Sequence, residues 1–252
     1  MTIAAVAALA GSANGAFDSA HRLNSTVRFL TDLPGVQQVE WTVDGQSQLA
    51  LQDFYISING GSVVALSSFS TIGVQVIGSD TLSVAYIDAG LGVQASVVYT
   101  LSGSAGQLSD LEINIQIDNI SNGVMDIEFF QFVDFDLGGT VADQSVNALG
   151  IPVNNVRQND FGVSVSEAVT APPPSSWQVG EASSVLAAVL AGSLDGTTSS
   201  GAGDLGWAIS WERTLNRFGS LIITKDLQLT VPTPGAAGLL AIAGLAATRR
   251  RR

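Results

Sequence analysis

The chain has 252 residues and a formal net charge of −12 at pH 7, with 13% charged residues, no cysteine and one histidine. A protein this acidic repels phosphate backbones and anionic lipid surfaces, which argues against nucleic-acid binding. The composition excludes disulfides, thiolate catalysis and metal sites built from cysteine or several histidines. A Ser-His-Asp triad would have to use His21.

Residues 1–16 have the character of an export signal. Residues 3–10 are apolar, small residues follow, and Ala13 and Ala16 fit the small-residue pattern of a signal-peptide cleavage site. A positively charged start is missing, so a buried first strand or helix is the alternative. We expect residues 1–16 to direct export and residues 17–230 to form the exported body.

The body shows the alternation of apolar and polar residues that is typical of strands with one buried face. In residues 111–117, branched apolar residues alternate with Glu112, Asn114 and Gln116. Similar patterns predict strands over residues 39–43, 49–58, 73–77, 82–86, 93–101, 126–135, 162–167, 205–213 and 220–229. No fixed repeat or dividing linker is present. We therefore predict an all-β fold, a single antiparallel β-sandwich of about a dozen strands.

One short helix is expected within this β-rich body. Residues 183–191 place their large apolar side chains on one helical stripe, and Gly192 can end the helix. The proline-rich residues 171–176 form a rigid exposed connection. Residues 197–203 contain only Gly, Ala, Ser and Thr and predict a mobile loop.

The most site-like stretch lies around Asp134 and Asp136. Side chains two residues apart share a strand face, and Asp143 can return through the turn at Gly138 and Gly139. Three carboxylates make a candidate Ca²⁺ site, although the EF-hand pattern is absent. The first two could also divide the acid and base roles of a glycosidase, and the structural alternative is a solvated strand face.

The tryptophans give a second candidate. Trp207, Ile209 and Trp211 fall on one strand face, and Trp41 alternates with valines, so we expect these three tryptophans in the core. Trp177 follows the prolines and is the most exposed candidate. Its ring could stack on a sugar ligand.

The C-terminal residues 231–252 form a distinct tail. Residues 235–248 are uncharged and predict a hydrophobic helix of about 21 Å, shorter than the ~30 Å hydrocarbon core of a bilayer. Positive charge stays on the cytoplasmic side of a membrane. The tail ends with the chain's only basic block, Arg249, Arg250, Arg251 and Arg252. We therefore expect the body to lie outside the membrane. The alternative is a frayed amphipathic tail.

This tail resembles the PEP-CTERM protein-sorting signal. The matching features are Val231, Pro232 and Pro234, the apolar run and the arginine block; Thr233 replaces the usual glutamate, and Gly235 follows. The resemblance implies processing near the prolines by an exosortase, a membrane protease-transpeptidase. It also implies transient anchoring in the inner membrane and delivery to the cell envelope or the extracellular polysaccharide matrix. The tail is also similar to the C-terminal domain of ice-binding proteins, but the scattered threonines argue against ice binding.

The body resembles an uncharacterised group of ectodomains that carry such tails, through residues 129–140, 165–177, 207–212 and 223–226. This group implies no activity. We predict an exported, non-enzymatic protein of the envelope or matrix, without a cofactor. One alternative is a carbohydrate-binding or carbohydrate-active module that uses the aspartates or an exposed tryptophan. Another is a surface protein that stays anchored because Thr233 prevents processing.

Overall fold

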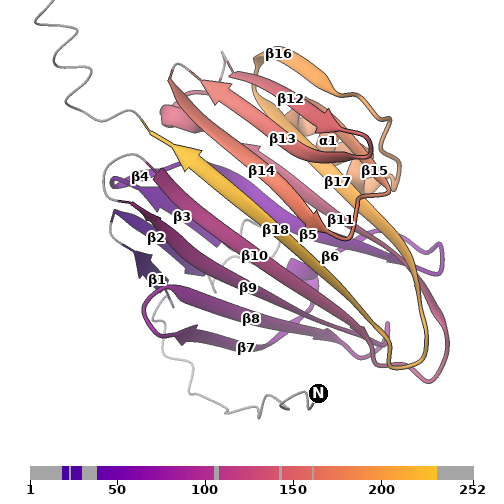
Figure 1. Ribbon diagram of the computed structural model, residues 1–252. Helices are drawn as coiled ribbons and strands as arrows, with labels where there is room; N and C mark the ends of the chain where they lie inside the picture. Colours follow the sequence, from indigo (N-terminus) through magenta and orange to yellow (C-terminus); the bar gives the residue numbers. More distant parts are fainter. Residues whose placement is uncertain are drawn as a thin grey trace, which may run out of the picture.

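The computed structural model describes residues 19–22, 24–29, 39–104, 108–141, 144–160 and 162–231. These ranges contain eighteen strands and one α-helix, and the strands form three antiparallel sheets. The largest sheet is the front layer in Figure 1, and the two smaller sheets lie behind it. The predicted all-β character, with antiparallel sheets and one short helix, is confirmed.

The front layer is a nine-stranded sheet that combines strands from distant parts of the chain. Its order is β16 (Ser199–Gly203), β12 (Gln144–Gly150), β13 (Val153–Asp160), β14 (Val163–Ala171), β18 (Ser220–Thr230), β10 (Leu108–Asn119), β9 (Val93–Ser104), β8 (Thr81–Asp88) and β7 (Ser70–Ile77). In β10, Leu111, Ile113, Ile115 and Ile117 are wholly buried. The polar residues between them lie on the outer face, as the alternation predicts.

The back layer consists of two smaller sheets. The five-stranded sheet has the order β15 (Ser176–Glu181), β17 (Leu205–Leu215), β11 (Met125–Phe135), β5 (Leu49–Ile58) and β6 (Val64–Ala65); the four-stranded sheet runs β1 (Ser19–Arg22), β2 (Ser25–Phe29), β3 (Val39–Val43) and β4 (Gln46–Ser47). Strand β11 occupies the middle of its sheet. Its residues Phe129 and Val133 join the core between the layers, whereas Phe130 and Phe132 join a separate cluster on the outer face.

One apolar core connects the two layers and includes residues of all three sheets. Trp41, Trp207 and Trp211, which the alternation places in the core, are each 0% exposed. Full burial of an isoleucine or phenylalanine side chain contributes about 1.5–3 kcal/mol, so this core is the main source of stability. The indole nitrogen of Trp41 also donates to Ser109 Oγ at 3.1 Å and ties β3 to β10.

The single α-helix, α1 (Ala182–Leu190), covers the outer face of the five-stranded sheet. Val185 and Val189 are wholly buried against the outer phenylalanines of β11. Glu181 caps the first turn by accepting a backbone hydrogen bond. Gly192 follows the helix with φ of 65°, a left-handed conformation that glycine adopts without steric cost.

Two sequence-based expectations need correction, and two lie outside the described residues. Eighteen strands replace the expected dozen. Residues 199–203, expected as part of a loop, form edge strand β16, which pairs with β12. This Gly/Ser-rich strand is held by backbone pairing with β12 and has no large apolar side chains to bury. Its sequence therefore lacks the alternation of apolar and polar residues that predicts a strand. In the described part of the chain, no helix has the length and apolar character needed to cross a bilayer. The expected export segment and C-terminal helix both lie outside the described residues.

Candidate functional site

The end of β11 carries the two aspartates that the sequence singles out. Because side chains alternate along a strand, Asp134 shares the outer face with Phe130 and Phe132, which pack under α1. Across the sheet its partner in β17 is Gly206, and the next residue in that row is Gly180 of β15. On this side of Asp134, two successive positions in the row therefore have no side chain.

Three carboxylates meet at this corner of the sheet. Asp134, Asp136 and Asp204 each place one carboxylate oxygen within 4.8 Å of the other two. Asp136 directly follows β11, and Asp204 lies between β16 and β17. The backbone carbonyl of Asp204 accepts a hydrogen bond from Ala182 N at 3.0 Å, which places the cluster beside the start of α1. We call Asp134, Asp136 and Asp204 the aspartate cluster.

The environment of the aspartate cluster favours protonation. Burial raises the pKa of Asp134 to about 7, and the neighbouring charges of Asp204, Asp136 and Glu181 act in the same direction. Burial and the charge of Asp204 also raise the pKa of Asp136. The Oδ1 atom of Asp134 is buried and has no hydrogen-bond partner among the described residues. This carboxyl group is therefore poised to exchange a proton near neutral pH.

This arrangement supports two kinds of chemistry. A half-buried carboxyl group with a pKa near 7 can act as a proton donor, while a nearby carboxylate accepts a proton. Three converging carboxylate oxygens also suit a hard cation such as Ca²⁺, which binds carboxylate and carbonyl oxygens. Both involve Asp134, which would either keep its proton and donate it or lose it to bind the cation.

The structure brings together only part of the predicted set. Asp134 and Asp136 lie side by side, whereas Asp143 lies outside the described residues. The third member of the cluster, Asp204, is separated from Asp136 by more than sixty positions in the sequence. No local spacing links these residues. A sequence signal existed only in the Gly-rich stretch that precedes Asp204, which we interpreted as a loop.

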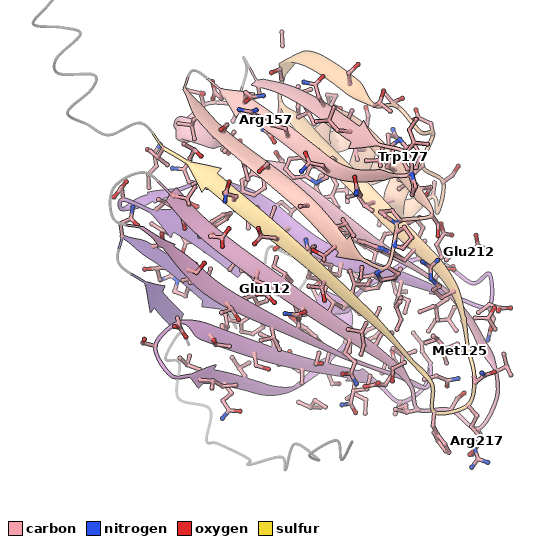
Figure 2. All side chains as sticks on the ribbon, viewed as in Figure 1. Glu112, Met125, Arg157, Trp177, Glu212 and Arg217 are labelled. Carbon is pink, nitrogen blue, oxygen red and sulfur yellow. The ribbon has the colours of Figure 1, made fainter. Side chains whose placement is uncertain are left out.

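The second sequence candidate, Trp177, has a different environment. It lies in β15, is half-buried and packs against the core between the layers (Figure 2). Its indole nitrogen donates to the Gly196 carbonyl at 3.1 Å. Of the predicted sorting motif only Val231 belongs to the described residues. Pro232, Thr233, Pro234, Gly235 and the four terminal arginines lie beyond them.

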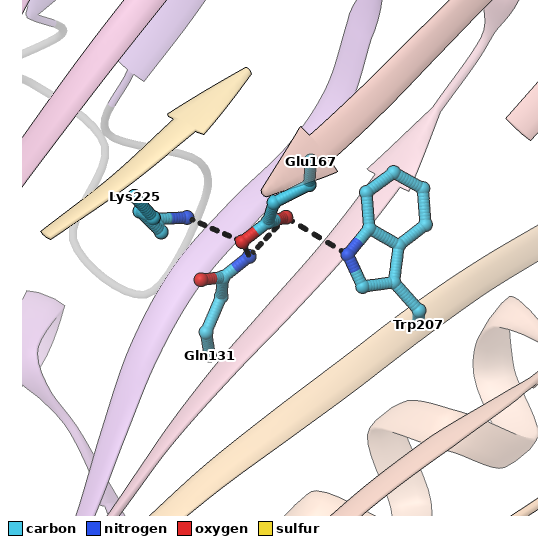
Figure 3. A network of polar contacts seen from close by, with 4 residues as sticks. All are labelled: Gln131, Glu167, Trp207 and Lys225. Carbon is cyan, nitrogen blue, oxygen red and sulfur yellow. Dashed lines mark hydrogen bonds and ion pairs between the residues drawn. The ribbon is translucent and has the colours of Figure 1, made fainter. Parts of the chain in front are cut away.

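A second group of charged residues is enclosed between the layers (Figure 3). Glu167 of β14 and Lys225 of β18 form an ion pair of 3.2 Å, and both side chains are 0% exposed. Gln131 Nε2 donates to both carboxylate oxygens at 2.8 and 2.7 Å, and Trp207 Nε1 donates at 2.9 Å. Burial lowers the pKa of Lys225, and Glu167 opposes this shift. The network connects the two layers, since Glu167 and Lys225 belong to the nine-stranded sheet and Gln131 and Trp207 to the five-stranded sheet. Because solvent does not reach these atoms, the network is not a candidate site.

A third polar group lies on the outer face of the nine-stranded sheet, where Glu112 is visible in Figure 2. Glu112 of β10 pairs directly with Asp226 of β18. Burial raises the pKa of Asp226 to about 6, and the nearby carboxylates of Asp110 and Glu112 contribute. Like charges directly opposite each other weaken a strand pair. Asp226 is a useful control for Asp134, because its pKa is also raised and its side chain lies on the outer face of the other layer.

Comparison with known proteins identifies solved structures that share this fold. No family model and no curated protein sequence matches the chain. A bacterial glucoamylase complexed with acarbose matches with a TM-score of 0.59 and 7% identity, over 94% of this chain and 36% of the glucoamylase. The chain thus spans about a third of that protein's length.

Two smaller proteins match over nearly their whole lengths. A galactose mutarotase-like protein from Lactobacillus casei has a TM-score of 0.53 and 8% identity, over 85% of this chain and 100% of its own. A putative aldose 1-epimerase from Escherichia coli K12 has a TM-score of 0.52 and 9% identity, over 86% and 99%. At these identities the likeness establishes a shared fold.

The shared fold corrects one prediction from the sequence. We predicted a non-enzymatic protein because the sequence contains no catalytic motif. That prediction is wrong as a statement about the fold, since the same β-sandwich occurs in proteins described as a glucoamylase and a putative aldose 1-epimerase. The carbohydrate-related alternative agrees better with the comparison. The physical reason for the error is that the aspartate cluster joins residues that are distant in the sequence, so no local motif reveals it.

Proposed function

We propose that this chain is a carbohydrate-active β-sandwich protein whose aspartate cluster carries out acid–base chemistry at the anomeric carbon of a sugar. The observation that carries this proposal is Asp134. Its pKa is raised to about 7, and one oxygen from each of Asp136 and Asp204 lies within 4.8 Å of its own. The fold shared with the mutarotase-like protein and the putative aldose 1-epimerase adds support.

The chemistry requires one donor and one acceptor at the same time. Opening a cyclic aldose needs a proton on the ring oxygen and removal of a proton from the anomeric hydroxyl, while the bond between the anomeric carbon and the ring oxygen breaks. At neutral pH, Asp134 is protonated about half of the time and can donate to the ring oxygen. The solvent-exposed Asp204 is placed to accept the hydroxyl proton. Closure on the other face of the carbonyl returns both protons and gives the other anomer.

The test is the rate at which the protein interconverts the anomers of simple aldoses, followed by polarimetry. Asp134→Asn should lower the rate by about 10²–10⁴-fold, the usual contribution of a positioned acid or base. Asp226→Asn is the matched control, since this carboxyl also has a raised pKa but lies on the outer face of the other sheet. An unaccelerated reaction with wild-type protein, or an equal loss in both variants, would contradict the proposal.

A parallel assay distinguishes the reaction type. Hydrolysis of aryl glycosides uses the same pair of roles, with a water molecule or a carboxylate attacking the anomeric carbon. If wild-type protein releases the aryl group and does not interconvert free sugars, the cluster belongs to a hydrolase. Addition of Ca²⁺ and of a chelator in both assays shows whether a cation, in place of a proton, occupies the cluster.

We further propose that the protein acts outside the inner membrane and is sorted through its C-terminal tail. The support is the ordered combination of Val231, Pro232 and Pro234, an uncharged apolar run and four arginines. An exosortase is the processing partner, and polysaccharide of the envelope or matrix is the surrounding material. Mass spectrometry of released protein should show loss of the tail near Pro234. Released protein that still carries Arg249 and the residues after it would contradict this route, and an uncleaved membrane-bound form would favour permanent anchoring.

A further inference from the structure

Three polar side chains gather on the buried face of the nine-stranded sheet, on the adjacent strands β12 and β13 (Figure 1). Gln144 and Gln158 are 0% exposed, and Asp160 is 4% exposed. Gln158 and Asp160 are two residues apart on one strand and share its buried face. The strands pair at Ser145 and Asn159, so Gln144 and Asp160 occupy the next opposing positions. The three side chains therefore lie together at one corner of the sheet.

Hydrogen bonds fix which way the two glutamine amides point. Gln144 Nε2 donates to the carbonyls of Phe135 at 2.8 Å and Thr140 at 2.9 Å. Gln158 Nε2 donates to the same Phe135 carbonyl at 2.9 Å and to Gln144 Oε1. Because a backbone carbonyl can only accept, the amide nitrogens must face it, and these bonds use every amide hydrogen. Gln158 Oε1 is left buried and without a partner among the described residues.

Asp160 supplies a second unpartnered oxygen. Its Oδ2 atom accepts a hydrogen bond from the Thr140 hydroxyl, whereas its Oδ1 atom is buried and has no hydrogen-bond partner in the described part of the chain. Neither of the ion pairs found among the described residues includes Asp160. An enclosed carboxylate without a compensating positive charge is costly. The corner therefore lacks positive charge at two neighbouring side chains.

The unpartnered atoms indicate which ligand fits. Both are oxygens, one of a carboxylate and one of an amide, and hard cations bind these two oxygen types. The corner encloses a single carboxylate among neutral groups, so one positive charge balances it. A divalent ion would leave an enclosed excess of positive charge. We propose that Asp160 and Gln158 hold a monovalent cation, Na⁺ or K⁺, with the Thr140 hydroxyl beside it. We call these three residues the Asp160 site.

The turn between β11 and β12 connects the Asp160 site to the aspartate cluster. The carbonyl of Asp136, at the start of this turn, accepts from Gly139 N at 3.0 Å, and Thr140 is the next residue. Thr140 is exposed, which gives the ion a route from solvent. The two sites share no residue, but an ion at the Asp160 site would hold the turn whose first residue is Asp136.

The test is the thermal midpoint of the full chain in sodium, potassium and choline chloride at one ionic strength, so that screening by salt is equal. Wild-type protein should melt about 2–4 °C higher in sodium or potassium chloride than in choline chloride, because an ion that binds only the native state stabilises it. The salt that gives the larger shift identifies the resident ion. Broadening of the ²³Na resonance by wild-type protein measures sodium binding directly.

Asp160→Asn should melt at the same temperature in all three salts. The substitution removes the charge, and the new amide can donate to Gln158 Oε1. Asp134→Asn is the matched control and should keep the wild-type difference, because Asp134 belongs to the aspartate cluster. Thr140→Val is a second variant at an exposed position, and loss of its hydroxyl should reduce the difference between the salts.

Equal midpoints of wild-type protein in the three salts would overturn the proposal. They would assign the corner to a buried water molecule, which can donate to both oxygens. A midpoint that responds to Ca²⁺ and to neither monovalent ion would also overturn it, as would a wild-type salt difference in Asp160→Asn. These measurements follow stability and not anomer interconversion, so they are independent of the proposed function.

Discussion

Glu167 lies between the layers and Asp134 lies on the outer face of the five-stranded sheet, and the two carboxylates differ in how fully they are hydrogen-bonded. Glu167 is fully enclosed, yet Gln131, Trp207 and Lys225 all donate to it. Asp134 is only half-buried, yet its Oδ1 atom has no hydrogen-bond partner among the described residues, and the charges around it are negative. Both carboxylate oxygens of the first site accept hydrogen bonds, and the network holds the layers together. In the second site, the Asp134 oxygen has no partner in the described part of the protein and is therefore available to a substrate or a cation.

This difference predicts opposite effects of neutralising each carboxylate, and the buried pair should give the largest. Glu167→Gln leaves the Lys225 charge enclosed without its partner. Such a change costs about 3–5 kcal/mol of unfolding free energy, measured by urea denaturation. The double variant Glu167→Met, Lys225→Met is the control and should recover most of the loss. A single variant with wild-type stability would show that the pair does not support the core.

Two buried glutamines, one with hydrogen bonds to Glu167 and one without partners among the described residues, should differ in the same way by a smaller amount. Gln131→Leu removes two hydrogen bonds to a buried carboxylate, so it should lower the unfolding free energy by about 1.5–3 kcal/mol. Gln52 is equally buried, but neither of its amide atoms has a partner among the described residues. Gln52→Leu should therefore leave stability unchanged or raise it by about 1 kcal/mol. Equal losses in both variants would contradict the role assigned to the Gln131 amide.

Neutralising Asp134 should do the reverse and stabilise the protein at alkaline pH. A carboxyl group whose pKa is raised on folding binds more protons in the native state, so stability is fully present below about pH 4 and is lost as pH rises through about 7. Asp134→Asn removes this loss. After allowance for solvent screening, it should gain about 1–2 kcal/mol at about pH 8. Urea denaturation across this pH range checks the sign, and a variant that is less stable than wild type at alkaline pH would contradict it.

Binding of Ca²⁺ to the aspartate cluster should change stability less than the substitutions described above. Bound Ca²⁺ would raise the thermal midpoint of wild-type protein and leave Asp134→Asn unchanged, because binding to the native state alone stabilises it. An equal response of the two proteins to Ca²⁺ and chelator would exclude the aspartate cluster as the cation site.

The sequence predicts the strands that have one buried face and one exposed face, because apolar and polar residues then alternate along the strand. Strand β10 and the tryptophans of β17 are such cases. It fails for β16, whose glycines and serines pair through backbone atoms alone. It also predicts Asp134 and Asp136 as neighbours, since two residues on one strand face are a local property. Asp204 and the Glu167–Lys225 pair depend on the order of strands in the sheets, which no local pattern contains.

The pH dependence of anomer interconversion tests the central claim most directly. If Asp134 is the proton donor, the catalytic efficiency of wild-type protein should fall as pH rises through about 7, and Asp134→Asn should lack this step. Asp226→Asn, with its carboxyl on the other face, should keep the wild-type profile. A profile that is flat from about pH 5 to about pH 9, or one that Asp134→Asn leaves unchanged, would contradict the assignment of this carboxyl group as the acid.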